Sequence, residues 1–466
     1  MKKILLSITA SILTIFSMAN NIVVSSGTLS GQNIIAHSEI ITFNLSWDNS
    51  WRTSTNESNY DGAWLFVKFR KMGTTDWRHC TINTTGFVAG AGGTITVPTD
   101  SKGAFINRSA DGLGTVTFTG NQLIWNYGVD GILDNETVEI RVFALEMVYI
   151  PTGSFQLGSG GSEITAFMDG TSGTPYLVAS NAAINLGTTT GTLNPNTQGP
   201  TTGTIPAAYP KGYNAYWIMK YECSQQQYVD FLNHLDFARA TANNSPAFTG
   251  THPGFIALQP ERAVQSVGSG RTAALADWSG LRPMSELEYE KACRGYNTPA
   301  LANEYVWGNT TVVPLITVSA TGTSSEAVAT PVTANANLAT SYGNLAVRVG
   351  LFARTSGSDR TLSGGTYYGV MNMGDNVYED CVNMVAATGR ALDASVHGDG
   401  YLAPSGNSDI PVWTAYTAYG LRGSAYNVTA PYARTSDRAN INFFVTFVGS
   451  DSNISNGGIR LVRTAP

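Results

Sequence analysis

The feature that most constrains the fold is a change of pattern near Glu146. From residue 20 to about residue 144, short runs rich in β-branched and aromatic residues alternate with turn clusters, and amphipathic helix patterns appear only afterwards. Regularly spaced short strands are typical of an antiparallel sandwich, whereas mixed strands and helices indicate an α+β unit. A chain of 466 residues is also too long for one ordinary core. The sequence therefore predicts an immunoglobulin-like β-sandwich at residues 20–145 and an α+β domain at residues 146–466.

The strand pattern WLFVKFR indicates how the first domain packs. Leu65, Val67 and Phe69 share one face of this strand, because successive side chains point to opposite sides. The other face carries Lys68 and Arg70. We expect the first face to be buried and the second to be partly wet.

Two helices are predicted in the second domain from their start signals. Ser224 with Gln227, and Ser285 with Glu288, each form the capping-box pattern ahead of an apolar helical repeat. Gly295 follows the second repeat, where a left-handed residue ends a helix. Two stretches rich in Gly, Thr, Asn and Ala, at about residues 157–208 and 309–346, are predicted to be loop insertions.

The N-terminus predicts the compartment. Two lysines precede a short apolar run that leads into small residues, which is the pattern of a secretory signal over residues 1–19. No later apolar stretch is long enough for a membrane helix, so we expect no membrane insertion. Charged residues make up only 13% of the chain, and its net charge of -6 comes without charged blocks. This balance suits a secreted, extracellular or cell-surface protein, with the periplasm as the alternative, and it disfavours nucleic acid as a partner.

The cysteines and histidines lack metal-binding spacing. Cys80, Cys223, Cys293 and Cys381 are far apart and form no CxxC pair, so no disulfide framework is needed, although one bridge stays open. The five histidines form no HxxxH or HExxH pattern. The sequence thus gives no support for a histidine-based metal site.

A series of motifs in the second domain follows a recognisable order. The motifs are EMVYIPTGSFQLGS, YWIMKYECSQQQYVDFL, WSGLRPMSELEYEKACRG, YVWGN, YYGVMNMGDNVYEDC, LRGSAYN, ARTSDR and GGIRLVR. Over residues 146–463 this series resembles the formylglycine-generating, sulfatase-modifying-factor family. The resemblance implies a variant of the C-type lectin fold for this part of the chain.

The resemblance also implies a calcium site. In the family, the counterpart of NMGDNVYE binds calcium through an amide side chain, two backbone carbonyls and a carboxylate. Here these ligands would be Asn372, the carbonyls of Asp375 and Val377, and the Glu379 carboxylate. Hard oxygen ligands suit calcium. The alternative is that this loop is an ordinary turn whose polar side chains bond to local backbone.

The resemblance stops at the catalytic thiols. Oxidase members of the family hold copper with a pair of C-terminal thiolates, because Cu(I) prefers soft sulfur. This chain has no cysteine after Cys381, and the matching segment offers Asn427, Val428, Thr429 and Tyr432. The iron-dependent relatives need a histidine cluster that is absent here. We therefore expect neither copper nor iron and favour a non-catalytic role, with an altered-site oxidoreductase as the alternative.

The C-terminal segment supplies the candidate ligand-binding surface. The candidate residues are Tyr426, Asn427, Arg434, Asp437, Arg438, Asn440, Asn442, Phe443 and Phe444. The charged ones either line a pocket or brace the loops through ion pairs, and bracing is favoured. The run FFVTFV either exposes aromatic anchors or forms a buried strand, which a continuous apolar run favours. Asparagines in this position also resemble the diversified loops of lectin-like family members.

Two functions remain open from the sequence. The first is self-assembly into a filament or surface layer, with the chain itself as partner, and the second is binding of an extracellular protein or glycan. The stretch NNIVVSSGTLSG would serve assembly if it added a strand to a neighbouring sheet. The alternative, which we favour, is that it forms the first strand of its own sandwich.

Overall fold

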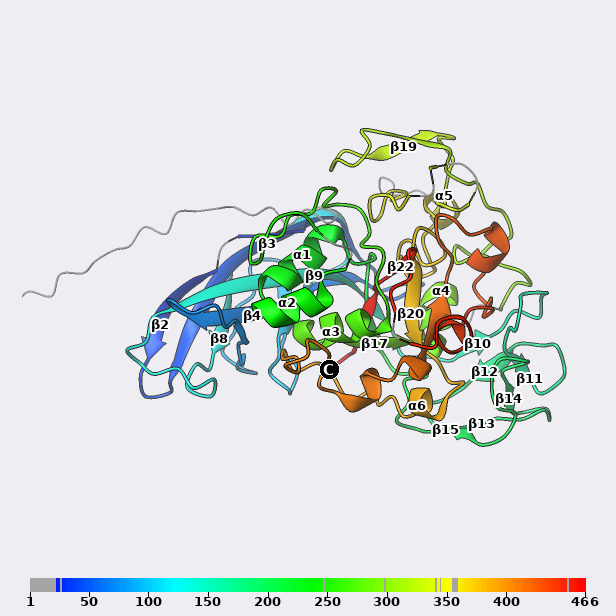
Figure 1. Cartoon of the computed structure of the whole chain (residues 1–466), viewed down its shortest axis with the longest axis horizontal. Helices are drawn as coiled ribbons and strands as arrows, with labels where there is room; N and C mark the ends of the chain where they lie inside the picture. The colour runs from blue at the N-terminus through cyan, green and yellow to red at the C-terminus, as the bar shows by residue number, and fades with distance from the viewer. Residues whose placement is uncertain are drawn as a thin grey trace, which may run out of the picture.

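The computed structural model describes residues 22–25, 27–245, 248–296, 299–339, 342–343, 345–353, 359–450 and 452–466 (Figure 1). The predicted signal sequence, residues 1–19, lies outside these residues. Within the described part, no helix has both the length and the apolar character needed to cross a membrane.

A four-stranded antiparallel sheet forms from the N-terminal part of the chain. Its long central strand is β3 (Ser38–Arg52), which pairs with β8 (Gly112–Trp125) on one side. On the other side lie β1 (Val23–Val24) and β2 (Thr28–Asn33). The stretch considered as an intermolecular arm therefore pairs with β3 of its own chain.

An eleven-stranded sheet runs through the rest of the molecule in the order β21-β20-β17-β23-β16-β9-β4-β7-β6, with β22 paired to β20 and β5 paired to β4. Its strands are β4 (Asp61–Lys71), β5 (Arg78–His79), β6 (Gly93–Thr96), β7 (Ala104–Arg108), β9 (Val138–Ile150), β16 (Tyr216–Met219), β17 (Arg282–Ser285), β20 (Tyr378–Val382), β21 (Tyr419–Arg422), β22 (Gly457–Gly458) and β23 (Leu461–Thr464). Most neighbours are antiparallel, but β20 runs parallel to both β17 and β22.

Strand β9 joins the two parts of the chain. It pairs with β4 along residues 138–148, and its end pairs with β16 at residues 147–150. The boundary predicted between residues 145 and 146 thus falls inside one continuous strand. A single sheet passes from the N-terminal part into the C-terminal part (Figure 1).

Strand β4 is buried on both faces. Leu65, Val67 and Phe69 pack with residues of β3 and β8 in a core between the two sheets, as the alternation predicts. The expectation of a wet second face is wrong for Lys68, which is fully buried. Its ammonium group donates to the backbone oxygen of Trp278 at 2.7 Å, and burial holds its pKa well below the ordinary value. The second face is buried because helix α3 (Ser269–Ser279) covers it.

The two predicted helices are present. α1 (Gln225–Asn233) and α4 (Glu286–Arg294) begin at Ser224 and Ser285, and both capping boxes form. Gly295 ends α4 with a φ of 85°, and a side chain there would collide with the ring of Tyr367. Helices α2 (Phe237–Asn243), α3, α5 (Arg360–Ser363) and α6 (Ala387–Arg390) were not predicted.

Both predicted insertions contain short strand pairs. The first holds β10 (Phe155–Leu157) with β12 (Tyr176–Val178), β11 (Met168–Asp169) with β14 (Leu193–Asn194), and β13 (Ile184–Asn185) with β15 (Thr204–Ile205). The second holds β18 (Thr317–Ser319) with β19 (Ala327–Thr330). The apolar side chains of the first insertion belong to the main core, so this segment is an integral part of the fold.

Candidate functional site

The predicted calcium loop leads directly into β20 and is buried. Asn372 and Asn376 adopt left-handed backbone conformations, with φ of 58° and 70°, which asparagine tolerates better than most residues. The amide oxygen of Asn372 accepts a hydrogen bond from the Gly350 N–H at 2.9 Å, and its nitrogen donates to the Asp375 carboxylate at 3.2 Å. Asp375 also accepts from the Asn337 N–H at 2.7 Å. The loop therefore bonds to segments far from it in sequence, beyond what an ordinary turn does.

Glu222 joins this loop from the segment between β16 and α1. Its carboxylate accepts hydrogen bonds from the Asn376 side chain at 2.6 Å and from the Val377 N–H at 3.1 Å. Sequence reasoning missed Glu222, because a single carboxylate ahead of a helix carries no spacing signal.

The loop holds three carboxyl groups and one nearby guanidinium group. Glu379 pairs with Arg460 at 2.5 Å, and Asp375 and Glu222 lie near the same guanidinium group. Burial raises the pKa of Asp375 and of Glu379 to about 7, and it raises that of Glu222 well above its ordinary value. One buried oxygen of Glu379 has no hydrogen-bond partner among the described residues. A bound calcium ion would favour the ionised form of these carboxyl groups, and their hard oxygen atoms are the ligand type that it prefers.

Arg438 lies in the core and not in an open pocket. It is fully buried, and its guanidinium group donates to Glu286 at 2.7 Å and to the backbone oxygen of Thr165 at 2.9 Å. The group also lies 3.8 Å from the ring centroid of Phe167. Arg422 adds a second guanidinium to the same α4 carboxylates, at 2.9 Å from Glu290. These ion pairs brace the C-terminal loops against α4, so the predicted bracing role applies to Arg438.

The other charged candidates make local contacts. Arg434 donates to the side-chain oxygen of Asn303 at 3.0 Å. Asp437 is nearly buried and accepts from the Ala439 N–H at 3.1 Å, and burial raises its pKa to about 6. Neither residue lines the cavity described below.

Two polar candidates join the C-terminal loops to each other. The Tyr426 hydroxyl donates to the backbone oxygen of Ser455 at 3.1 Å, and Asn427 accepts from the Asn456 side chain at 2.7 Å. Asn440 donates from its side chain to the Tyr378 hydroxyl at 2.8 Å.

The run FFVTFV forms a π-helical turn at Phe444–Val448, so the predicted buried strand is wrong. The Asn442 carbonyl accepts from Thr446 N–H at 2.9 Å, and Gly449 closes the turn with a φ of 68°. Phe444 points into the core, whereas Phe447 is 69% exposed. Phe443 is half-buried, and its ring centroid lies 5.3 Å from that of Phe447. Helical winding places these two rings together at the surface, which a strand would not do.

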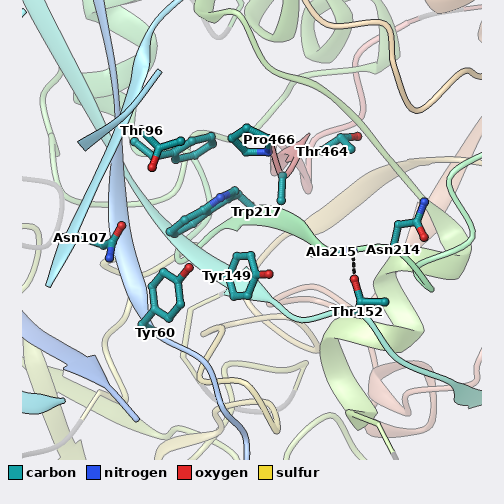
Figure 2. A pocket seen from close by; sticks show the side chains of 12 residues that line it. Tyr60, Thr96, Asn107, Tyr149, Thr152, Asn214, Ala215, Trp217, Thr464 and Pro466 are labelled. Carbon is teal, nitrogen blue, oxygen red and sulfur yellow. Dashed lines mark hydrogen bonds between the residues drawn. The ribbon is translucent and has the colours of Figure 1, made fainter. Parts of the chain in front are cut away.

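A separate cavity of about 460 Å³ lies where β9, β16 and β7 come together (Figure 2). The rings of Tyr60, Tyr149 and Trp217 meet there. Sequence reasoning missed these residues because they come from three distant segments, and each looks like an ordinary aromatic residue of a strand.

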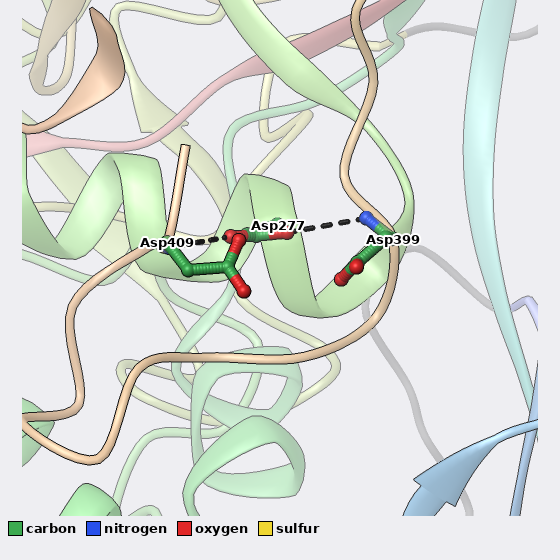
Figure 3. A group of neighbouring side chains, drawn as sticks. All are labelled: Asp277, Asp399 and Asp409. Atoms are coloured by element: carbon green, nitrogen blue, oxygen red, sulfur yellow. Dashed lines mark hydrogen bonds between the residues drawn. The ribbon is translucent and has the colours of Figure 1, made fainter. Parts of the chain in front are cut away.

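Three carboxylates, from Asp277, Asp399 and Asp409, have oxygen atoms within 4.8 Å of one another (Figure 3). Asp277 on α3 is buried and accepts hydrogen bonds from the backbone N–H groups of both neighbours and from the Ser408 hydroxyl. Burial, more than the charge of its neighbours, raises the pKa of Asp277 to about 6. These hydrogen bonds hold the 399–409 loop against α3, and this structural role explains why the three carboxylates lie together.

The family comparison agrees with the motif order. A family model described as the sulfatase-modifying factor enzyme 1-like domain matches residues 139–465. The chain belongs to this family. The match begins at the start of β9, the strand that enters the C-terminal part. No curated protein is significantly similar to the chain.

The cysteines of this sulfatase-modifying-factor domain and its N-terminal extension are all buried and unbridged. Burial raises the pKa of each thiol. The segment that the resemblance aligns with the family thiol pair lies near the surface instead, with Asn427 and Thr429 exposed. Reactive thiols need exposure and a lowered pKa, and these four have neither.

Proposed function

We propose that this sulfatase-modifying-factor domain belongs to a secreted, non-catalytic protein that binds a partner. The observation that carries the proposal is the chemistry of its thiols. Copper needs paired, accessible thiolates, whereas every cysteine here is in the core and the aligned segment carries amide, hydroxyl and phenol groups. Nothing in that segment replaces the soft ligands. The N-terminal apolar run supports secretion.

Binding is assigned to the C-terminal face, defined as Asn442, Phe443 and Phe447. Exposed aromatic rings bury a large area on contact and lose little conformational freedom. The π-helical turn supports this role, because it directs Phe447 outward while Phe444 anchors the turn in the core. A protein partner fits this face better than a charged ligand, since its side chains are aromatic and amide groups.

Calcium is assigned a structural role in the loop that leads into β20. Asn372, the carbonyls of Asp375 and Val377, and Glu379 would hold the ion, with the carboxyl group of Glu222 bonded to the same loop. The ion would neutralise buried carboxylates and fix the loop. No step of chemistry is assigned to it.

Self-assembly is the second candidate, and the edge of the four-stranded sheet favours it. Strand β2 pairs with β3 alone among the described strands, and nearly all of its residues are exposed. Ile35, just beyond β2, is 91% exposed. An unpaired edge with apolar residues is a template for pairing with another chain.

An oxygen-uptake assay tests the non-catalytic assignment. The purified protein, supplied with copper and a cysteine-containing peptide, is expected to consume no oxygen above a copper-only control and to leave the peptide mass unchanged. A cysteine-bearing family member, assayed in parallel, verifies the assay. Enzyme-dependent oxygen uptake together with peptide oxidation would refute the proposal.

Solution mass and electron microscopy separate binding from assembly. We expect a monomer for the wild type and for the variants Phe447→Ser and Ile35→Lys. Polymers that disappear in Ile35→Lys but persist in Phe447→Ser would establish assembly through the β2 edge. Polymers lost only in Phe447→Ser would make the C-terminal face a self-association surface.

A further inference from the structure

Aromatic rings form one wall of the cavity at the β9–β16 junction. The Trp217 ring stacks on Phe105 with a centroid distance of 4.5 Å and meets the Tyr149 ring edge-on at 5.4 Å. Tyr60 stacks on Tyr149 at 4.8 Å, almost parallel, with an interplanar angle of 10°. Each ring is thus held in place by another ring, so the wall is formed before any ligand arrives.

Gly62 makes this arrangement possible. A Cβ atom at this position would lie 3.1 Å from the edge of the Trp217 ring and 2.8 Å from the backbone oxygen of Ile106. The missing side chain lets the indole of Trp217 extend from β16 across β9 to the surface of β4. A larger residue at position 62 would displace the Trp217 ring, so the wall depends on this glycine.

The polar side chains that line the cavity are uncharged. Asn107 and Asn214 lie on opposite sides of the three rings in Figure 2, and the remaining polar lining side chains are threonines. The hydroxyls of Tyr60 and Tyr149 and the indole N–H of Trp217 form no hydrogen bond with any residue that the structure describes. The cavity thus combines aromatic rings with three hydrogen-bonding groups that have no partner among the described residues.

Charge narrows the class of ligand. No acidic or basic side chain lines the cavity, so an anionic ligand would have no counter-charge there. A cationic ligand would meet a second positive charge, because the Arg52 guanidinium group already lies 4.2 Å from the ring centroid of Tyr60. A neutral ligand with an apolar face and several hydroxyl groups matches both kinds of group.

We propose that this cavity binds a short, neutral saccharide. The electron-rich faces of aromatic rings attract the C–H groups of a sugar, while amides and hydroxyls hydrogen-bond to its edge. The volume of about 460 Å³ lies within the range of about 300–1,000 Å³ that is usual for small-molecule sites. This site goes beyond the proposed function and shares no residue with the C-terminal face, so either assignment can fail alone.

Isothermal titration of the full-length mature protein tests the proposal. The probes are glucose, galactose, mannose, N-acetylglucosamine and their disaccharides as free sugars, the corresponding oligosaccharides on a surface, and choline and acetate as charged probes. We expect at least one neutral sugar to bind with a Kd near about 1 mM or below. If free disaccharides bind, the natural ligand is a free sugar. If only the immobilised oligosaccharides bind, the natural ligand is a glycan. Both outcomes support the site.

Matched variants locate the binding. Tyr149→Ala removes a half-buried ring of the wall, and Asn214→Ala removes an exposed amide, so at least one of the two should stay folded. Each is expected to weaken sugar binding by about fivefold or more, as a lost contact of about 1 kcal/mol does. Tyr416→Ala, a half-buried tyrosine that does not line the cavity, is expected to bind like wild type.

Three results would overturn the proposal. The first is no heat with any neutral sugar up to about 50 mM, a range in which even weak sites are measurable. The second is sugar binding that both cavity variants leave unchanged while their thermal unfolding stays cooperative. The third is binding of choline or acetate without binding of any sugar.

Discussion

Replacing Arg438 by methionine is expected to lower the free energy of unfolding by about 3–5 kcal/mol, the usual effect of removing one member of a buried ion pair. Arg438 is fully buried, and its guanidinium group donates to Glu286 and to the backbone oxygens of Thr165 and Pro195. Methionine has a similar length but donates no hydrogen bond. The substitution leaves a buried carboxylate short of positive charge and three carbonyl groups, those of Thr165, Pro195 and Gln198, without this donor.

Equilibrium denaturation with urea measures this effect, and Arg434→Met is the matched control. Arg434 is half-buried and its guanidinium group donates to the neutral side chain of Asn303, so its loss should change stability by less than about 1 kcal/mol. A similar small change for both variants would contradict the bracing role of Arg438. A double substitution with Glu286→Gln then measures how strongly the pair is coupled.

Calcium is expected to raise the unfolding free energy of the chelator-treated protein by about 4 kcal/mol when its concentration is a thousand times the dissociation constant. The physical reason is that the buried loop holds Glu222, Asp375 and Glu379 with a single nearby guanidinium, from Arg460. A divalent ion would stabilise the ionised form of these carboxyl groups and use the Glu379 oxygen that lacks a partner among the described residues. Thermal unfolding with and without calcium measures the shift.

Glu379→Gln keeps the shape of the side chain and removes its charge, so this variant should lose most of the shift. Glu139→Gln alters a carboxylate in a half-exposed pair with Arg70, and it should retain the full calcium response. Magnesium should act more weakly, because it demands near-octahedral geometry and gives up its water reluctantly. An equal melting temperature in calcium and in chelator would reject the site.

Much of the local structure could be predicted from sequence. Ser224 and Ser285 start helices through contacts with residues three positions away, and Gly295 ends a helix by its own backbone freedom. The alternation in β4 likewise identified the face that packs between the two sheets. These features depend on near neighbours in the chain, which the sequence displays directly.

The candidate sites were less predictable. The motif order located the loop that contains Asn372 and Glu379, but it did not reveal Glu222, which reaches this loop from more than a hundred residues away in the chain. It also did not reveal that Phe444 and Phe447 point in opposite senses from one helical turn. The apolar composition of the run FFVTFV is compatible with a strand and with a helical turn, so it did not predict which side chains would be exposed.

The sequence by itself determined the family, the helix starts and the residues that form the buried loop before β20, because each rests on a local pattern or on motif order. Only the tertiary structure decided that Lys68 is buried, that Arg438 is a brace, and that three distant aromatic residues share one cavity. Burial depends on which segments cover a residue. Those segments lie far away in the chain, and no local pattern encodes them.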